Sequence, residues 1–136
     1  MNISVSQAQG RVPVTVIKLD GQLDGQTYQG LIAKAKEAHA GGGRDFLLDM
    51  TDLTYVSSAG LVALHTVALL LQGETVSDSE DGWAAMKAAK KTADDKMQEH
   101  IKLLNPRDEV KSVLDMVGFG SVFEIFTDLE EAVKSF

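Results

Sequence analysis

Two adjacent serines begin the most informative stretch of this sequence. The motif Ser57-Ser58-Ala59-Gly60 lies between a short apolar run at 46–50 and a longer apolar stretch that ends at Leu71. A serine hydroxyl at such a strand-to-helix turn can act as a nucleophile, cap the helix or accept a regulatory phosphate. The surrounding residues argue against the first of these roles and leave the other two open.

The nucleophile interpretation lacks the residues that it requires. A strained nucleophile elbow of the Gly-x-Ser-x-Gly type has a glycine two positions before its serine, and here Val56 occupies that position. His65 follows Ser58 by seven residues, which is about 10 Å along a helix axis and too far for a general base. The sequence therefore predicts no catalytic residue and a protein that is not an enzyme.

The two remaining roles are both compatible with the serine turn. A serine that caps a helix accepts a hydrogen bond from a backbone N–H two or three residues later, worth about 1 kcal/mol. The same helix start offers unpaired N–H groups and a partial positive charge, so it tolerates an added phosphate. A phosphoserine would bring about -1.5 to -2 charges to the surface.

Composition predicts one globular domain over residues 1–136. The chain is 44% hydrophobic and 24% charged, with a net charge of -7 and no cysteine. Absence of cysteine excludes disulfides and thiolate metal sites, and the acidic pairs lack histidine at ligand spacing, so we expect neither metal nor cofactor. The acidic balance argues against nucleic-acid binding.

No segment of the sequence predicts membrane association. The longest apolar stretch, residues 59–71, has about 13 residues, whereas a spanning helix needs about 20. The first ten residues show no basic region followed by an apolar one, as a secretory leader would. We therefore expect a cytoplasmic protein.

The spacing of apolar residues predicts an alternation of strands and helices that must position the serines. In the first half we expect two strands joined at Gly10-Arg11, a helix from Thr27 stopped by Gly41-Gly42-Gly43, a strand at 46–50 and the helix after the serines. In the second half we expect a strand at 101–104, a helix, a strand at 123–126 and a last helix capped by Asp128. The helix between these two strands should have Asn105 as its cap and Pro106 at its first position, and should stop at a left-handed Gly118. This order indicates an α/β fold with a mostly parallel sheet.

An insertion at about 74–99 interrupts this pattern. It begins with an acidic, turn-rich stretch and continues as a weakly amphipathic helix that carries Trp83 and Met86 on one narrow stripe. Lengthening a surface loop costs little free energy, so one interpretation is a tolerated excursion. The other is that Trp83 and Met86 form an interface with a partner or a second subunit.

Four segments together resemble the STAS domain of bacterial anti-sigma factor antagonists. They are Gly21-Gln22-Leu23-Asp24, residues 49–61, Asn105-Pro106 and residues 114–119. The resemblance orders nearly the whole chain except about 74–99. It implies a STAS-type fold, with a mixed, mostly parallel sheet of four to five strands, about four helices and one inserted helix.

The resemblance also implies a function. Such proteins bind an anti-sigma factor, often itself a serine kinase that uses ATP, and phosphorylation of a serine reverses the binding; a serine phosphatase is a further candidate partner. Aligning Gly60-Leu61 with the family's Asp-Ser-Ser/Thr-Gly-Leu string places the acceptor at Ser58. Ser57 stands in the acidic position and is the second candidate acceptor. The implied partner surface comprises Asp24, Thr54, Ser57, Ser58, Ala59 and Gly60, and we expect a monomer or weak homodimer.

A second hypothesis assigns the chain to another class. A STAS subunit that no kinase modifies can serve as a structural or interaction module of a larger signalling or lipid-transport assembly. Ser57 in place of the acidic residue and the insertion both favour this alternative.

Overall fold

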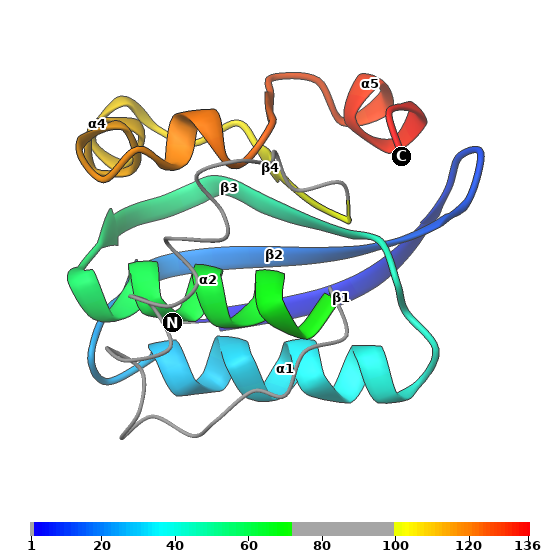
Figure 1. Cartoon of the computed structure of the whole chain (residues 1–136), viewed down its shortest axis with the longest axis horizontal. Helices are drawn as coiled ribbons and strands as arrows, with labels where there is room; N and C mark the ends of the chain where they lie inside the picture. The colour runs from blue at the N-terminus through cyan, green and yellow to red at the C-terminus, as the bar shows by residue number, and fades with distance from the viewer. Residues whose placement is uncertain (1, 72–99) are drawn as a thin grey trace.

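The computed structural model describes residues 2–71 and 100–136 as a mixed five-stranded sheet with helices on both faces (Figure 1). The sheet order is β1-β2-β3-β4-β5, with β1 antiparallel to β2 and the remaining neighbours parallel. The strands are β1 (Asn2–Gln9), β2 (Pro13–Leu23), β3 (Phe46–Val56), β4 (Ile101–Leu104) and β5 (Ile125–Phe126). The helices are α1 (Tyr28–Ala40), α2 (Ser58–Leu71), α4 (Asp108–Met116), the short 3-10 helix η2 (Phe119–Ser121) and α5 (Leu129–Lys134). In this part of the chain, the predicted α/β class, the mixed sheet of four to five strands and the four helices outside the insertion are confirmed.

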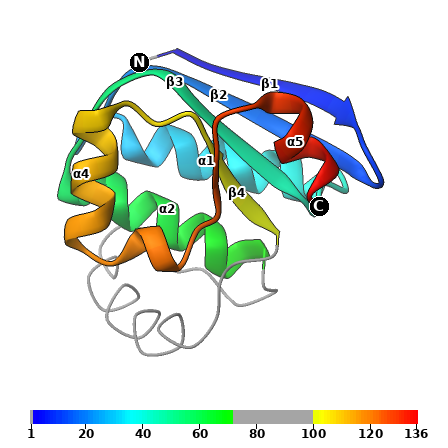
Figure 2. The same ribbon diagram turned by 90° about the horizontal axis from the view of Figure 1, so that it is seen from above.

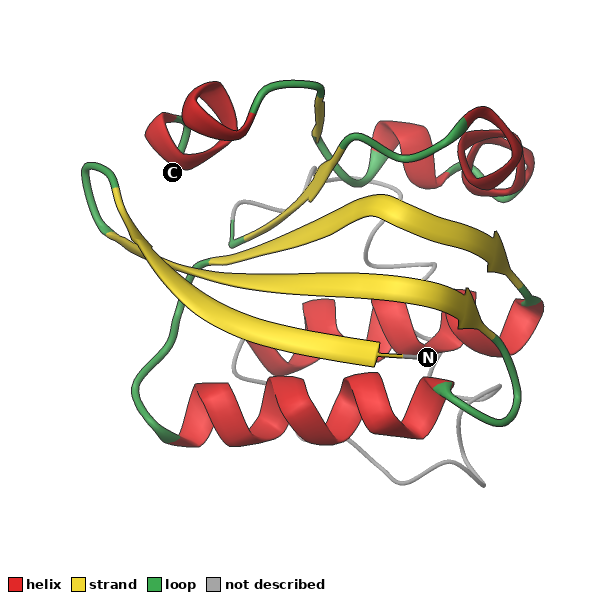
Figure 3. Ribbon diagram, turned by 180° about the vertical axis from the view of Figure 1, so that it is seen from behind, coloured by secondary structure: helices red, strands yellow, loops and turns green. Residues whose placement is uncertain are grey.

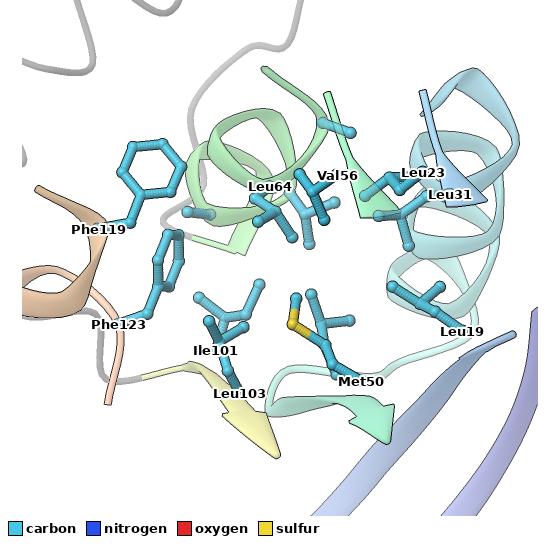
Figure 4. Close-up of a cluster of buried hydrophobic side chains, with 14 of the residues drawn as sticks. Leu19, Leu23, Leu31, Met50, Val56, Leu64, Ile101, Leu103, Phe119 and Phe123 are labelled. Carbon is cyan, nitrogen blue, oxygen red and sulfur yellow. The ribbon is translucent and has the colours of Figure 1, made fainter. Parts of the chain in front are cut away.

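The main core lies between one face of the sheet and the helices α1, α2 and α4. Helices α1 and α2 run side by side beneath the strands, as Figures 1 and 3 show. Because side chains alternate along a strand, Phe46, Leu48 and Met50 in the first half of β3 all point toward these helices. Figure 4 shows Leu19, Met50 and Leu103 from three strands in one buried cluster with Leu64 of α2 and Phe123. All five side chains are fully buried.

The opposite face of the sheet is covered near the β1–β2 hairpin by α5 (Figure 2). Val133 of α5 packs there against Val14 and Leu47. Lys102 holds the end of the chain in place: its ammonium lies 4.7 Å from the centroid of the Phe136 ring and donates to the carbonyl of Ser135 at 3.0 Å. A buried ammonium with these partners keeps its stem in the apolar layer and its charge satisfied.

The third strand is longer than the sequence predicted. Beyond the apolar run at 46–50, β3 continues to Val56 and pairs with β2 as far as Leu23 opposite Val56. The added part carries exposed threonines at 51 and 54 and a buried Leu53, so it has one wet face. The apolar run marked only the portion that is buried on both faces.

The predicted cap of α4 is wrong. The helix begins at Asp108, preceded by Arg107, so Asn105 is not its cap and Pro106 is not its first residue. Asn105 instead has a φ of 53°, a left-handed conformation that asparagine tolerates, and its side-chain amide donates to Thr51 Oγ1 at 3.3 Å. The left-handed stop at Gly118 and the Asp128 cap, which accepts from the backbone N–H of Glu131, are confirmed. The predicted inserted helix lies outside the described residues.

The hairpin tip packs so closely on α5 that it requires glycine. A Cβ placed on Gly10 would lie 2.7 Å from the carbonyl oxygen of Val133. We expect Gly10→Ala to lower the free energy of unfolding by about 1 to 3 kcal/mol, because α5 must move to admit the methyl group. Gly25, in an open turn with nothing near its Cβ position, is the matched control. Urea titration of both alanine variants tests this, and equal stability would contradict it.

Candidate regulatory serine site

The site is built where the two central parallel strands end together. Leu23 of β2 lies opposite Val56 of β3, and the backbone N–H of Ser57 donates to the carbonyl of Leu23 at 2.9 Å. Helix α1 follows β2 through the turn at 24–27, and α2 follows β3 directly (Figure 1). The carboxyl ends of parallel strands are where α/β proteins commonly place their functional groups.

The structure assigns different roles to the two serines. Ser57 is the cap of α2: its Oγ accepts from the backbone N–H of Gly60 at 3.4 Å, and its carbonyl accepts from Leu61 at 3.0 Å. Ser58 is the first residue of the helix and is exposed. Among the described residues, its hydroxyl makes no hydrogen bond. Ser58 therefore presents an uncommitted hydroxyl at a helix N-terminus.

Gly60 belongs to the packing beneath the site. It is buried, and a Cβ there would lie 2.7 Å from the carbonyl oxygen of Leu23 and 3.0 Å from Val56 Cγ1. The first turn of α2 can approach the strand ends this closely only because this residue has no side chain. Of the predicted surface residues, Gly60 supports the site from below and Ala59 is half-buried.

Asp24 and Thr54 lie on the strand ends beside the serines. Asp24 Oδ1 accepts from the backbone N–H of Gln26 at 2.9 Å, and its carbonyl accepts from Tyr28 at 2.9 Å, so this aspartate organises the turn into α1. The exposed Thr54 donates to the carbonyl of Gly21 at 2.9 Å across the two strands. Both residues are positioned by backbone contacts.

Sequence reasoning missed Tyr55, which precedes the serines and is 49% exposed. The pairing of β2 with β3 shifts register between Gly21 and Gln22, opposite this part of β3. The buried residues on either side, Leu53 and Val56, are consequently three positions apart. Strict alternation would have placed Tyr55 on the buried face, and no signal in the strand itself marks the shift.

One ion pair links β2 and β3 before the strand ends. The Lys18 ammonium lies 3.1 Å from Asp52 Oδ2, and this hydrogen bond, with the charge of the same carboxylate, raises the pKa of Lys18 above its usual value.

His65 is buried and its ring packs edge-to-face on Phe119, with 4.3 Å between ring centroids. It belongs to the aromatic part of the core.

Within the described ranges, no set of three acidic or histidine side chains is arranged to hold a metal ion. None of the helices in the same part of the chain has the length and apolar character needed to cross a bilayer. The candidate anchors Trp83 and Met86 lie outside the described residues.

This chain belongs to the STAS domain family. The model of that family matches residues 5–77, more than half of the sequence. The match includes β2, β3, α2 and both serines. No curated protein matches the sequence.

Solved structures of anti-sigma factor antagonists share the fold. One from Mycobacterium paratuberculosis is 13% identical with a TM-score of 0.66, covering 98% of this chain and 93% of its own. A putative antagonist from Thermotoga maritima is 12% identical with a TM-score of 0.67, covering 97% and 92%. The phosphorylated form of the Bacillus cell fate determinant SpoIIAA is 19% identical with a TM-score of 0.56, covering 97% and 96%.

The division of roles between the serines predicts unequal effects on stability. Ser57→Ala removes the cap of α2 and should lower the free energy of unfolding by about 0.5 to 1 kcal/mol, the low end for caps because the hydrogen bond is long. Ser58→Ala removes an exposed hydroxyl and should change it by less than about 0.5 kcal/mol. Chemical denaturation of the two single variants measures the difference, and a larger loss for Ser58→Ala would reverse the assignment.

Proposed function

We propose that this chain is an anti-sigma factor antagonist that binds an anti-sigma factor with serine kinase activity and is switched off by phosphorylation at Ser58. Residues 1–136 act as one STAS domain with an insertion at about 74–99. The protein is a cytoplasmic binding module, has no catalytic role and needs no cofactor. One observation carries the proposal: Ser58 is exposed at the start of α2, while the neighbouring serine does the capping.

The position of Ser58 suits a reversible phosphate. Its hydroxyl is available to a kinase, and the N-terminus of the 14-residue helix α2 favours negative charge. A partner that packs over this helix start would have to desolvate a group with about two negative charges. Mispairing a buried charge at an interface costs about 2 to 5 kcal/mol, and each 1.4 kcal/mol is tenfold in affinity. One phosphate can therefore abolish binding.

The proposed partner surface surrounds Ser58 at the strand ends. Asp24, Thr54, Tyr55 and Ala59 supply an acidic group, a hydroxyl, an exposed aromatic ring and a small residue. Tyrosine is among the residues that contribute most to protein interfaces, so Tyr55 is the proposed anchor. Ser57 and Gly60 hold this surface in place from within.

A second candidate function is the kinase-independent STAS module of a larger assembly. Its support is the serine at position 57, where the resemblance implies an acidic residue beside the phosphate acceptor. In this chain the side chain of Ser57 caps α2 by accepting a hydrogen bond from the backbone N–H of Gly60. The same surface would then bind a partner permanently, without a phosphate switch.

Phosphopeptide mapping separates the two candidates. Incubation of the chain with ATP and an anti-sigma factor kinase that binds it should place one phosphate on Ser58. The Ser58→Ala variant should take up none, while Ser57→Ala should remain a substrate because its acceptor hydroxyl is intact. Absence of phosphate from the wild-type chain would favour the kinase-independent module, and phosphate on Ser57 alone would reassign the acceptor.

Charge at position 58 should control affinity for the partner. We expect Ser58→Asp to weaken binding of the anti-sigma factor by at least about tenfold, and Ser58→Ala to bind like the wild type. Ser58→Asn, which is similar in size to the aspartate but neutral, is the matched control and should bind nearly normally. Titration calorimetry of the four proteins measures this, and equal affinity for all of them would contradict the switch.

A further inference from the structure

Strand β1 is an edge without the usual protection against pairing. It lies at one end of the sheet order, and within the described residues nothing pairs with its outer side. Its eight residues, Asn-Ile-Ser-Val-Ser-Gln-Ala-Gln, include no charge and no proline, and its register with β2 is continuous. Edge strands normally carry lysine, proline or a bulge, or are very short, to prevent association with other strands. The opposite edge, β5, has only two residues.

The hydrogen bonds of β2 identify which residues of β1 face outward. The backbone N–H of Thr15 donates to the carbonyl of Asp45, on the β3 side. Gln7, opposite Thr15, is therefore in a pair that exchanges no hydrogen bonds, and its own N–H and C=O point away from β2. Hydrogen-bonded and non-hydrogen-bonded residue pairs alternate along two antiparallel strands. The backbone groups of Ile3 and Val5 therefore also point away from β2. Pro13 opposite Gln9 fits the pattern, because proline has no N–H to donate.

We propose that β1 pairs antiparallel with β1 of a second copy of this chain, with the two-fold axis at Val5. In this register Val5 lies opposite Val5 of its partner and Ile3 lies opposite Gln7. These are the residues with outward backbone groups, so every pair exchanges two hydrogen bonds. The two sheets then form one continuous ten-stranded sheet, and the interface is the same patch on both copies.

Several properties of the edge favour a second copy over other occupants. Val5 is 43% exposed at the middle of the strand, and a copy would cover it with an identical β-branched side chain. Each chain carries a net charge of -7, so contact between the acidic surfaces of two copies is disfavoured. Strand β1 carries no charged residue and is therefore a neutral strip at which two copies can meet. Serines at 4 and 6 would face each other on the open side without steric conflict.

The pairing leaves the serine site accessible. Strand β2 separates β1 from β3 and α2, so the edge and Ser58 lie on different parts of the molecule. A dimer would therefore display two copies of the Ser58 surface. Dimerisation through β1 would not depend on phosphorylation, so a chain that stays monomeric would leave the proposed function unchanged.

A proline substitution tests the backbone hydrogen bonds directly. Because the Val5 N–H points away from β2, Val5→Pro removes a donor from the proposed interface and none from the fold, and edge strands tolerate proline. Sedimentation equilibrium should show a reversible dimer for the wild type. Val5→Pro should weaken dimerisation by at least about tenfold, since the two-fold axis doubles the loss.

A second variant covers the case in which proline disturbs the strand. Val5→Lys would place two positive charges opposite each other and should also weaken the dimer, while Val5→Thr keeps a β-branched side chain and should dimerise. Gln29→Lys, on the exposed face of α1, is the control for net charge. A wild type that is monomeric at all concentrations, or a Val5→Lys variant that dimerises as strongly as Gln29→Lys, would overturn the proposal.

Single cysteines test the register, because the natural chain has none. On the two-fold axis, the Cα atoms of the two residues at position 5 would be about 5.5 Å apart, within disulfide range. Position 9 lies four residues from the axis on each copy, so at about 3.4 Å per residue the two Cα atoms would be about 27 Å apart. Mild oxidation should cross-link Val5→Cys and leave Gln9→Cys monomeric. Equal cross-linking of the two variants would exclude this register.

Discussion

The close approach of the first turn of α2 to the end of β2 is the contact on which the site depends. The Leu23 carbonyl accepts a hydrogen bond from Ser57, and Gly60 leaves the space that the approach requires. Because this contact joins the carboxyl ends of two neighbouring strands, it also fixes the turn of Asp24 relative to Ser58. The buried core on the helix side then holds α2 along its whole length. The exposed Ser58 hydroxyl therefore lies on a helix that is held by the core and by the end of β2.

Much of the architecture could be predicted because local patterns and tertiary packing agree. The period of α1, the glycine stop at 118 and the Asp128 cap depend on neighbouring residues, and all three are confirmed. Asn105 was misassigned because its side chain bonds to Thr51 on another strand, a contact that no local pattern reports. The length of β3 was missed for a similar reason, since its polar half is stabilised by pairing with β2.

The position of the two serines at the start of a helix was predictable, but the different roles that they take in the turn were not. Either serine has the chemistry of a cap, and the choice depends on which residue of the turn takes the first helical conformation. That is set by the hydrogen bond from Ser57 to Leu23, a contact between residues far apart in sequence. Tyr55 escaped notice because the shift in pairing near Gly21 changes which side of β3 its neighbours face. Irregular pairing of strands is not encoded in the hydrophobic period of either strand alone.

The assignment of the cap to Ser57 constrains how a phosphate on Ser58 would act. Ser58 Oγ bonds to no described residue, so modification would remove no hydrogen bond from the fold that the structure describes. The added charge would sit in water at the positive end of α2, where it costs little and slightly favours the helix. A phosphate at this position would therefore change the charge of the surface and leave the positions of the strands and helices as they are. Any switch at Ser58 would act on the free energy of binding, through desolvation at the interface, and not through a rearrangement of this domain.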